Sequence, residues 1–223
     1  PPVKQLDQST LPKHPYANDN RRGMVAPDFD LEEVDMVFLK KSQEFLNKHV
    51  AETPEKPFFL LHSTKAVHLP SFPGNAFKGK TDSGPHGDFI FELDYVVGEL
   101  MKTLKRLNLD DNTLVIFTSD NGPEVPTVKR DNWEGGHRVP FLVRWPGKVP
   151  AGTTSSELTS LTDVMATIAE IVDTPLPDDA AEDSFSMLPV MLDASPQDPI
   201  RPYLLQQGFG GRKYLAIRRG RWK

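Results

Sequence analysis

Cysteine, long apolar runs and extended basic clusters are all absent from this sequence or rare in it. Its 223 residues contain no cysteine, so the chain can form no disulfide bond and offers no thiolate, although this leaves its redox compartment open. No apolar run approaches the ~20 residues of a transmembrane helix, so we expect no membrane span. The net charge is only −5, and a basic cluster occurs only at residues 218–223, where it alternates with apolar residues as in an edge strand. We therefore expect no nucleic-acid partner.

The composition supports a packed core. Apolar residues make up 38% of the chain and aromatic residues 9%, and the length allows one domain or a large part of one. Apolar spacing predicts helices over residues 30–50, 87–107 and 161–171, and strands over 58–61, 113–118, 141–145, 203–206 and 214–218. This alternation predicts an α/β fold with a mostly parallel sheet flanked by helices and a small antiparallel piece at the C-terminal end.

The first predicted helix has a recognisable start and one apolar face. Asp30 and Glu33 have the spacing of an N-cap residue and its capping-box partner. The apolar residues Leu31, Val34, Phe38 and Phe45 recur at helical spacing and predict the buried face.

A strand that ends in oxygen-bearing side chains is the main chemical signal. Leu114–Thr118 is apolar or β-branched throughout, which is typical of a strand covered on both faces, and Ser119, Asp120, Asn121 and Gly122 follow it. Ligand sites of open α/β sheets lie just beyond the carboxyl ends of such strands. A carboxylate and an amide carbonyl are hard donors that suit Ca²⁺ or Mg²⁺. The alternative is a strand that simply enters an Asn-Gly turn.

Two further blocks have a distinctive order. Lys129 lies four residues before Trp133, which opens the run Trp-Glu-Gly-Gly-His-Arg-Val-Pro, and an apolar strand closed by Trp145-Pro-Gly comes next. Earlier in the chain, the apolar run 57–61 leads through His62 to His68-Leu69-Pro70. Together with the strand-end motif, this order resembles the sulfatase family, arylsulfatase-A-like members above all, from about residue 18 to the C-terminus.

The resemblance implies a fold, an activity and roles for four residues. The fold would be alkaline-phosphatase-like, and the activity would be hydrolysis of sulfate monoesters. Asp120 and Asn121 would be ligands of the metal, Ca²⁺ rather than Mg²⁺. Lys129 would contact the sulfate and His68 would approach the ester oxygen, so both would be catalytic and substrate-binding. The partner would be a sulfated small molecule or a sulfated carbohydrate, in the periplasm, outside the cell or in a lysosome.

The nucleophile of that family is not found in this sequence. Sulfatases use a formylglycine made from the Cys or Ser of Cys/Ser-x-Pro-x-Arg. No such motif occurs here, since Ser71-Phe72-Pro73 is followed by Asn75 where the Arg would stand. We therefore expect an N-terminal part to supply the formylglycine and the first-strand carboxylates, and we expect the 223 residues alone to be inactive. The predicted division is an extended segment at 1–27, the C-terminal part of the catalytic domain at 28–195, and the start of a C-terminal antiparallel subdomain at 196–223.

Other interpretations stay open at this point. A phosphodiesterase or phosphonate monoester hydrolase would share the metal-bearing scaffold, and a non-catalytic binding module would keep it without a nucleophile. Lys65 lies near His68 but has no matched role, and His137 is either structural or substrate-facing. We expect packing and turn roles for Trp133, Gly135 and Gly136, and a structural role for His62.

Overall fold

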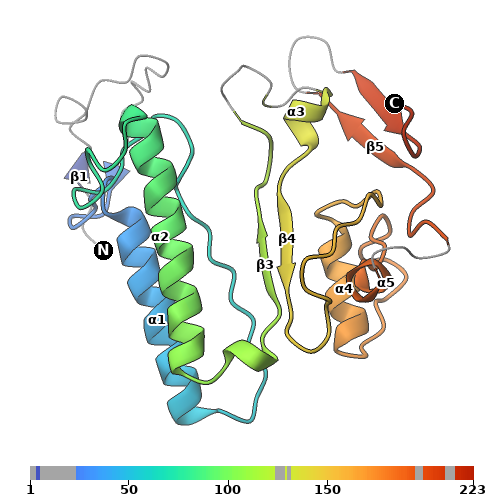
Figure 1. Cartoon of the computed structure of the whole chain (residues 1–223), viewed down its shortest axis with the longest axis horizontal. Coiled ribbons are helices and arrows are strands. Elements are labelled where there is room, and N and C mark those ends of the chain that lie inside the picture. Colours follow the sequence, from blue (N-terminus) through green and yellow to red (C-terminus); the bar gives the residue numbers. More distant parts are fainter. Residues whose placement is uncertain (1–3, 6–23, 124–128, 130–131, 194–197, 209–213) are drawn as a thin grey trace. The chain divides into compact units, whose positions relative to one another are not determined.

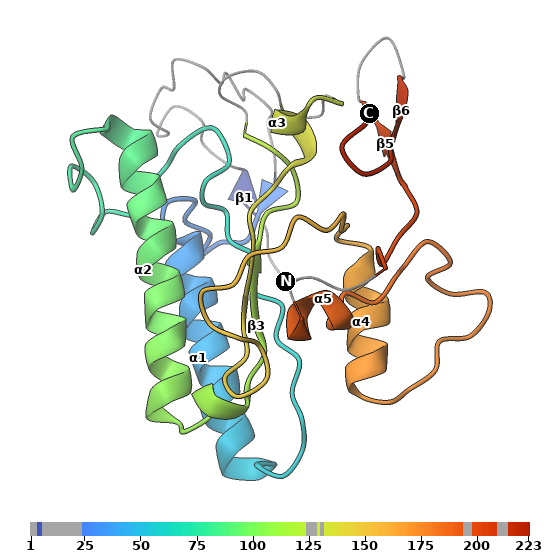
Figure 2. The ribbon, with the colours of Figure 1, turned by 45° about the vertical axis from the view of Figure 1, so that its right-hand side comes forward.

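The computed structural model describes residues 4–5, 24–123, 129, 132–193, 198–208 and 214–223, and the chain divides into two compact units. The first unit comprises residues 1–110 and the second comprises residues 111–223. Figures 1 and 2 show the helices and strands of each unit from two directions. None of the helices in the described ranges is both long enough and apolar enough to cross a bilayer.

Two long helices dominate the first unit. Helix α1 (Val34–Glu52) lies alongside α2 (Gly84–Arg106) in both views, and the short strands β1 (Lys4–Gln5) and β2 (Met24–Val25) pair antiparallel. The buried apolar side chains come from both helices and from the segment that connects them: Leu39, Leu46, Ala66, Phe72, Phe77, Phe89, Val96 and Leu104. The connecting segment, residues 53–83, is therefore part of the core of this unit.

The buried face of α1 differs from the predicted one. Phe38 and Phe45 are 45% and 41% exposed, so the prediction of this face was wrong. The residues that are buried recur every three or four positions and include polar ones: Asp35, Leu39, Ser42, Leu46 and His49. Burial of these polar groups is acceptable because each has a partner, as in the 2.8 Å hydrogen bond between Ser42 Oγ and His62 Nδ1. Apolar periodicity alone could not identify a face that is buried through hydrogen bonds.

The start of α1 also differs from the prediction. The helix begins at Val34, and its N-cap residue, Glu33, makes no capping hydrogen bond through its side chain. Asp30 instead accepts a hydrogen bond at Oδ1 from the backbone N–H of Glu32 at 3.0 Å. The predicted capping box is therefore replaced by a local turn before the helix.

The second unit combines strand pairs with short helices. Strand β3 (Val115–Thr118), which follows the 3₁₀ turn η2 (Asp110–Asn112), pairs antiparallel with β4 (Phe141–Arg144), with Thr118 opposite Phe141. Helix α3 (Glu134–His137) precedes β4, and α4 (Asp163–Ile171) and α5 (Leu188–Leu192) follow it. Strands β5 (Leu204–Gln207) and β6 (Leu215–Arg218) form the antiparallel pair predicted for the C-terminal end.

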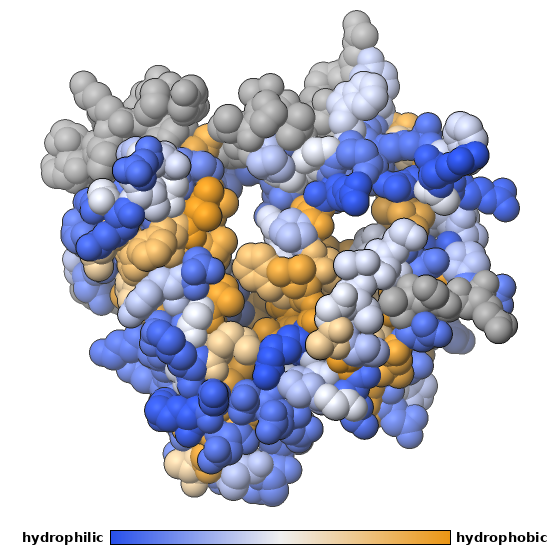
Figure 3. All heavy atoms as spheres, viewed as in Figure 1, coloured by the Kyte–Doolittle hydropathy of each residue, from blue (hydrophilic) through white to orange (hydrophobic). Residues whose placement is uncertain are grey.

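The α/β class is confirmed, but the mostly parallel sheet is not observed in the described ranges. All three strand pairs there are antiparallel, and Phe58–Leu61 is not a strand. Phe59 and Leu61 are 70% and 76% exposed while Phe58 and Leu60 are half-buried, so the segment alternates as a strand does. No neighbour among the described residues supplies ladder hydrogen bonds to it. Strand β3 has one neighbour and is half-buried rather than covered on both faces. Apolar side chains are accordingly exposed on each unit (Figure 3).

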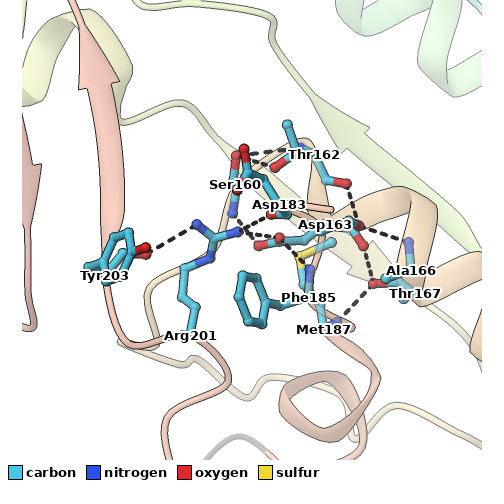
Figure 4. A network of polar contacts seen from close by, with 11 residues as sticks. Ser160, Thr162, Asp163, Ala166, Thr167, Asp183, Phe185, Met187, Arg201 and Tyr203 are labelled. Carbon is cyan, nitrogen blue, oxygen red and sulfur yellow. Dashed lines mark hydrogen bonds and ion pairs between the residues drawn. The ribbon is translucent and has the colours of Figure 1, made fainter. Parts of the chain in front are cut away.

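A buried ion pair ties the C-terminal part of the second unit to α4. Asp163 is fully buried, and its Oδ1 accepts hydrogen bonds from Arg201 Nη2 at 2.5 Å and from the Phe185 N–H at 3.0 Å (Figure 4). Arg201 also donates to the carbonyl oxygens of Asp183 and Tyr203. Because the carboxylate and the guanidinium are both multiply hydrogen-bonded, the pair holds three chain segments together without an unpaired buried charge.

Candidate active site

The predicted metal ligands lie side by side at the end of β3. The strand ends at Thr118, and Ser119 Oγ then donates to the Asn121 carbonyl at 3.0 Å, which closes a tight turn. Asn121 Nδ2 donates to Asp120 Oδ2 at 2.6 Å. Asp120 is exposed and Asn121 is half-buried. The turn thus presents a carboxylate and an amide together, beyond the last hydrogen-bonded residue of the strand.

This pair fits part of a Ca²⁺ site. Carboxylate and amide oxygens are the donors that Ca²⁺ takes, and the ion needs about six to eight of them. Within the described residues, no group of three or more His, Cys, Asp and Glu side chains is placed to hold a metal. Asp120 and Asn121 therefore suit the ion chemically, and a complete site requires further oxygen ligands.

Gly122 packs the Asp120–Asn121 turn directly against α3. Its backbone N–H donates to the Gly136 carbonyl at 3.0 Å. A Cβ atom at position 122 would lie only 1.7 Å from the Gly135 carbonyl oxygen, so no side chain fits there. Gly122 therefore allows the close backbone approach, and Gly135 and Gly136 take part in packing as the sequence predicts.

Two hydrogen bonds hold the start of α3 against the β5–β6 hairpin. Arg218 Nη1 donates to Glu134 Oε1 at 2.6 Å, and Asn132 Nδ2 donates to the Tyr214 carbonyl at 2.9 Å. Trp133 lies between these two contacts and is 73% exposed, so the packing role predicted for it is not observed. The Asp120–Asn121 turn thus packs against α3, and α3 is held by the β5–β6 hairpin.

His68 lies on the exposed part of the connection between α1 and α2. Its Nδ1 is 2.5 Å from the Leu69 carbonyl oxygen. A carbonyl oxygen can only accept, so Nδ1 carries a hydrogen, and proton transfer to a substrate would use Nε2. The segment that follows, residues 70–74, is mostly buried. The imidazole of His68 is therefore exposed, and the segment that follows it is held in the core.

Buried charges lie beneath this segment. Lys65 Nζ donates to the carbonyl oxygens of Leu31 at 2.6 Å and Phe72 at 2.8 Å, and it lies 4.8 Å from the centre of the Phe89 ring. Burial lowers the pKa of Lys65. Lys65 therefore links two backbone segments within the first unit through its ammonium. Sequence reasoning left its role open because proximity to His68 along the chain does not reveal where the side chain points.

Glu92 of α2 is a second buried charge that the sequence did not indicate. It is 0% exposed, its Oε2 accepts a hydrogen bond from the Gly74 N–H at 2.7 Å, and its Oε1 is buried without a hydrogen-bond partner among the described residues. Burial raises the pKa of Glu92, and Asp35 adds to this effect while Lys65 opposes it. A glutamate on an amphipathic helix normally faces solvent, and the structure shows that Glu92 instead shares the buried face of Phe89 and Val96.

The raised pKa of Glu92 predicts a pH dependence of stability. A carboxyl whose pKa is higher in the folded than in the unfolded state stabilises the fold at low pH, and this contribution is lost as pH rises through the folded-state pKa. In the full-length protein, the free energy of unfolding should therefore fall more steeply with rising pH for the parent than for Glu92→Gln. Urea unfolding from mildly acidic to mildly alkaline pH measures the difference. Glu44→Gln, at an exposed position on α1, is the control and should follow the parent; parallel curves for parent and Glu92→Gln would contradict the prediction.

The other histidines have structural surroundings. His62 Nδ1 lies 2.8 Å from Ser42 Oγ, and burial lowers the pKa of His62, which fits the structural role predicted for it. His86 Nδ1 lies 2.8 Å from Ser71 Oγ at the start of α2. His137 is half-buried at the end of α3.

The four predicted site residues come from both units. Asp120, Asn121 and the half-buried Lys129 belong to the second unit, and His68 belongs to the first. The structure brings Asp120 and Asn121 together. The roles of all four residues, and the predicted divisions of the chain at residues 27/28 and 195/196, remain predictions.

The chain is similar to several known proteins. The crystal structure of the PsFucS1 sulfatase from Pseudoalteromonas sp. matches 89% of this chain with a TM-score of 0.77 and 30% identity, over 42% of its own length. N-acetylgalactosamine-6-O-sulfatase of Bacteroides thetaiotaomicron is 37% identical over 213 residues, which cover 86% of this chain and 40% of that protein. Arylsulfatase A of Homo sapiens is 35% identical over 187 residues, which cover 78% of this chain and 36% of that protein.

The fold thus defines an α/β protein of the alkaline-phosphatase-like class. A family model described as Sulfatase matches residues 5–174. The chain belongs to the sulfatase family. It spans about 40% of the length of these relatives.

Proposed function

We propose that the protein containing this chain is a sulfuric ester hydrolase that cleaves sulfate monoesters. The observation that carries the proposal is the Asp120–Asn121 pair, fixed just beyond the end of β3 in a chain of this family. A sulfate ester is a stable anion, so the site must offset its charge before a nucleophile can approach. We propose a formylglycine in an N-terminal part of the protein as that nucleophile.

Each proposed residue has a separate task. When bound, Ca²⁺ supplies positive charge and Lewis acidity at a sulfate oxygen. Asp120 and Asn121 would hold the ion, and Lys129 would bind and orient the sulfate. The ester oxygen gains negative charge as the S–O bond breaks. His68, whose Nδ1–H is taken by the Leu69 carbonyl, would donate a proton to that oxygen from Nε2.

Sulfated carbohydrates are the substrate class that we propose. One relative is named as an N-acetylgalactosamine-6-O-sulfatase, and a structure that matches with 26% identity and a TM-score of 0.69 contains k-i-k-neocarrahexaose. Human steryl-sulfatase is also similar, at 35% identity over 159 residues, so steryl and aryl sulfates are the competing class. A periplasmic, secreted or lysosomal location is part of the same proposal.

Sulfate release by the full-length protein tests the proposal. The purified protein should release sulfate from a sulfated sugar, lose this activity when a chelator removes divalent ions, and regain it when Ca²⁺ is added. Asp120→Asn keeps the oxygen but removes the charge, and should weaken Ca²⁺ binding by about tenfold in calorimetry, because ligand charge tunes the affinity. Asp111→Asn, an exposed carboxylate in η2, is the control and should bind Ca²⁺ as the parent does.

The outcomes separate the candidate functions. Release of phosphate or of a phosphonate ester's alcohol without release of sulfate would assign the scaffold to phosphoryl chemistry. Unchanged Ca²⁺ affinity in Asp120→Asn would show that the metal site lies elsewhere. The 223 residues alone, which lack a Cys/Ser-x-Pro-x-Arg motif, should show no turnover under any of these conditions.

A further inference from the structure

A buried aspartate on α1 holds the segment that leads into His68. Asp35 is 0% exposed, although it lies in the first turn of a helix where a carboxylate usually faces solvent. Its Oδ1 accepts a hydrogen bond from the Lys65 N–H at 2.6 Å, and its Oδ2 accepts one from the Ala66 N–H at 3.0 Å. Both carboxylate oxygens are thus used on two consecutive backbone donors, 30 and 31 residues away in the chain.

These two donors open the turn that ends at His68. The His68 N–H donates to the Lys65 carbonyl at 3.0 Å, which closes a four-residue turn from Lys65 to His68. Thr64 Oγ1 donates to the Ala66 carbonyl at 2.6 Å and supports the same turn from the other side. Asp35 therefore fixes the first half of the turn whose last residue carries the imidazole.

Other buried and half-buried charges support the same segment. Lys65 Nζ ties the Leu31 carbonyl to the Phe72 carbonyl. Glu92 holds the far end of the segment through the Gly74 N–H. The segment 64–74 is thus anchored at both ends by buried charges, and His68 lies exposed between the anchors. A functional side chain on a loop is placed accurately only when such supporting bonds fix the backbone beneath it.

We propose that Asp35 is a positioning residue for His68, which it holds in place through the backbone of the Lys65–His68 turn. The inference rests on the proposed role of His68 as the proton donor to the leaving group. Asp35 itself touches no substrate. Its replacement by asparagine removes the negative charge and one of the two acceptors, and lets the imidazole depart from the geometry that proton transfer needs.

The test compares two aspartates with the same kind of contact. In the full-length protein, Asp35→Asn keeps one acceptor but turns an amide N–H toward the second backbone donor. Asp88→Asn is the matched control. Asp88 is buried, and it accepts hydrogen bonds from the backbone N–H groups of Gly79 at 2.7 Å and Thr81 at 2.8 Å, beyond the His68 turn. Both variants should lose thermal stability, which differential scanning calorimetry measures.

Of these two variants, only Asp35→Asn should change how the rate depends on the leaving group. Across aryl sulfates of graded phenol pKa, kcat/KM of this variant should fall by about tenfold for the poorest leaving groups and stay near the parent value for the best, because a displaced acid helps only departures that need a proton. Asp88→Asn should keep the parent slope. Thr64→Val removes the milder support of the same turn and should show a smaller steepening, so it decides the question if Asp35→Asn does not fold.

His68→Ala, measured in the same series, separates the two hypotheses. If His68→Ala steepens the slope while Asp35→Asn and Thr64→Val keep that of the parent, the positioning role is wrong. An equal steepening in Asp88→Asn would also overturn it, because the effect would then come from general loosening. If His68→Ala itself leaves the slope unchanged, the proposed role of His68 fails instead.

Discussion

Replacing Gly122 by alanine should weaken Ca²⁺ binding by the full-length protein by about 10–100-fold, the range typical of changes in the groups that orient metal ligands. The reason is steric. The new Cβ atom would lie 1.7 Å from the Gly135 carbonyl oxygen and 2.7 Å from its carbon, and neither backbone atom can turn aside as a flexible side chain would. Either α3 or the Asp120–Asn121 turn must shift, and the Gly122 N–H bond to the Gly136 carbonyl must lengthen.

The same substitution should destabilise the fold by about 3 kcal/mol, at the upper end of what overpacking costs. Gly98→Ala is the matched control. Gly98 lies inside α2 with nothing within 4 Å of the added atom, so alanine there should leave Ca²⁺ binding unchanged and stabilise the helix by about 0.5–1 kcal/mol. Calorimetric Ca²⁺ titration and urea unfolding of both variants give the two comparisons. Parent-like Ca²⁺ affinity in a folded Gly122→Ala protein would show that the turn does not need its contact with α3.

Sequence and structure agree where a local pattern decides the outcome. The strand that ends before Asp120, the helix after Thr162 and the C-terminal hairpin all follow from short-range apolar spacing and turn residues. Asp120 and Asn121 follow this strand as the sequence indicates, and their role as metal ligands stays a prediction. These features depend on residues within a few positions of one another, and the chain itself carries that information.

The predictions failed where distant segments decide the outcome. The face of α1 was assigned from Phe38 and Phe45, but the helix buries Asp35 and Ser42, whose partners lie 30 and 20 residues further along. A carboxylate in a helical pattern is indistinguishable from a solvated one until the backbone donors that it satisfies are known. The strand at Phe58–Leu61 was predicted from an apolar run, but such a run is a strand only when a neighbour supplies its hydrogen bonds, and none does among the described residues.

Removal of the imidazole should have the largest effect on catalysis, and its size should depend on the substrate. If His68 protonates the leaving oxygen, His68→Ala should lower the turnover of a sulfated sugar by about 10²–10⁴-fold, the usual contribution of a positioned general acid. The loss should be far smaller for a nitrophenyl sulfate, because an activated phenolate departs readily without a proton. His86→Ala is the control, since this half-buried histidine contacts Ser71 at the start of α2 and should not alter the leaving-group dependence.

Lys129→Ala should give the opposite signature, because the sulfate charge is present in every substrate. Its cost should be similar for good and poor leaving groups and should appear in kcat/KM. Kinetics of the parent, His68→Ala and Lys129→Ala on aryl sulfates of graded phenol pKa distinguish the two roles in one experiment. A His68→Ala slope no steeper than that of the parent would remove His68 as the proton donor. A Lys129→Ala loss confined to poor leaving groups would instead place the lysine at the ester oxygen, where its ammonium would stabilise the departing anion and take over the role proposed here for the imidazole.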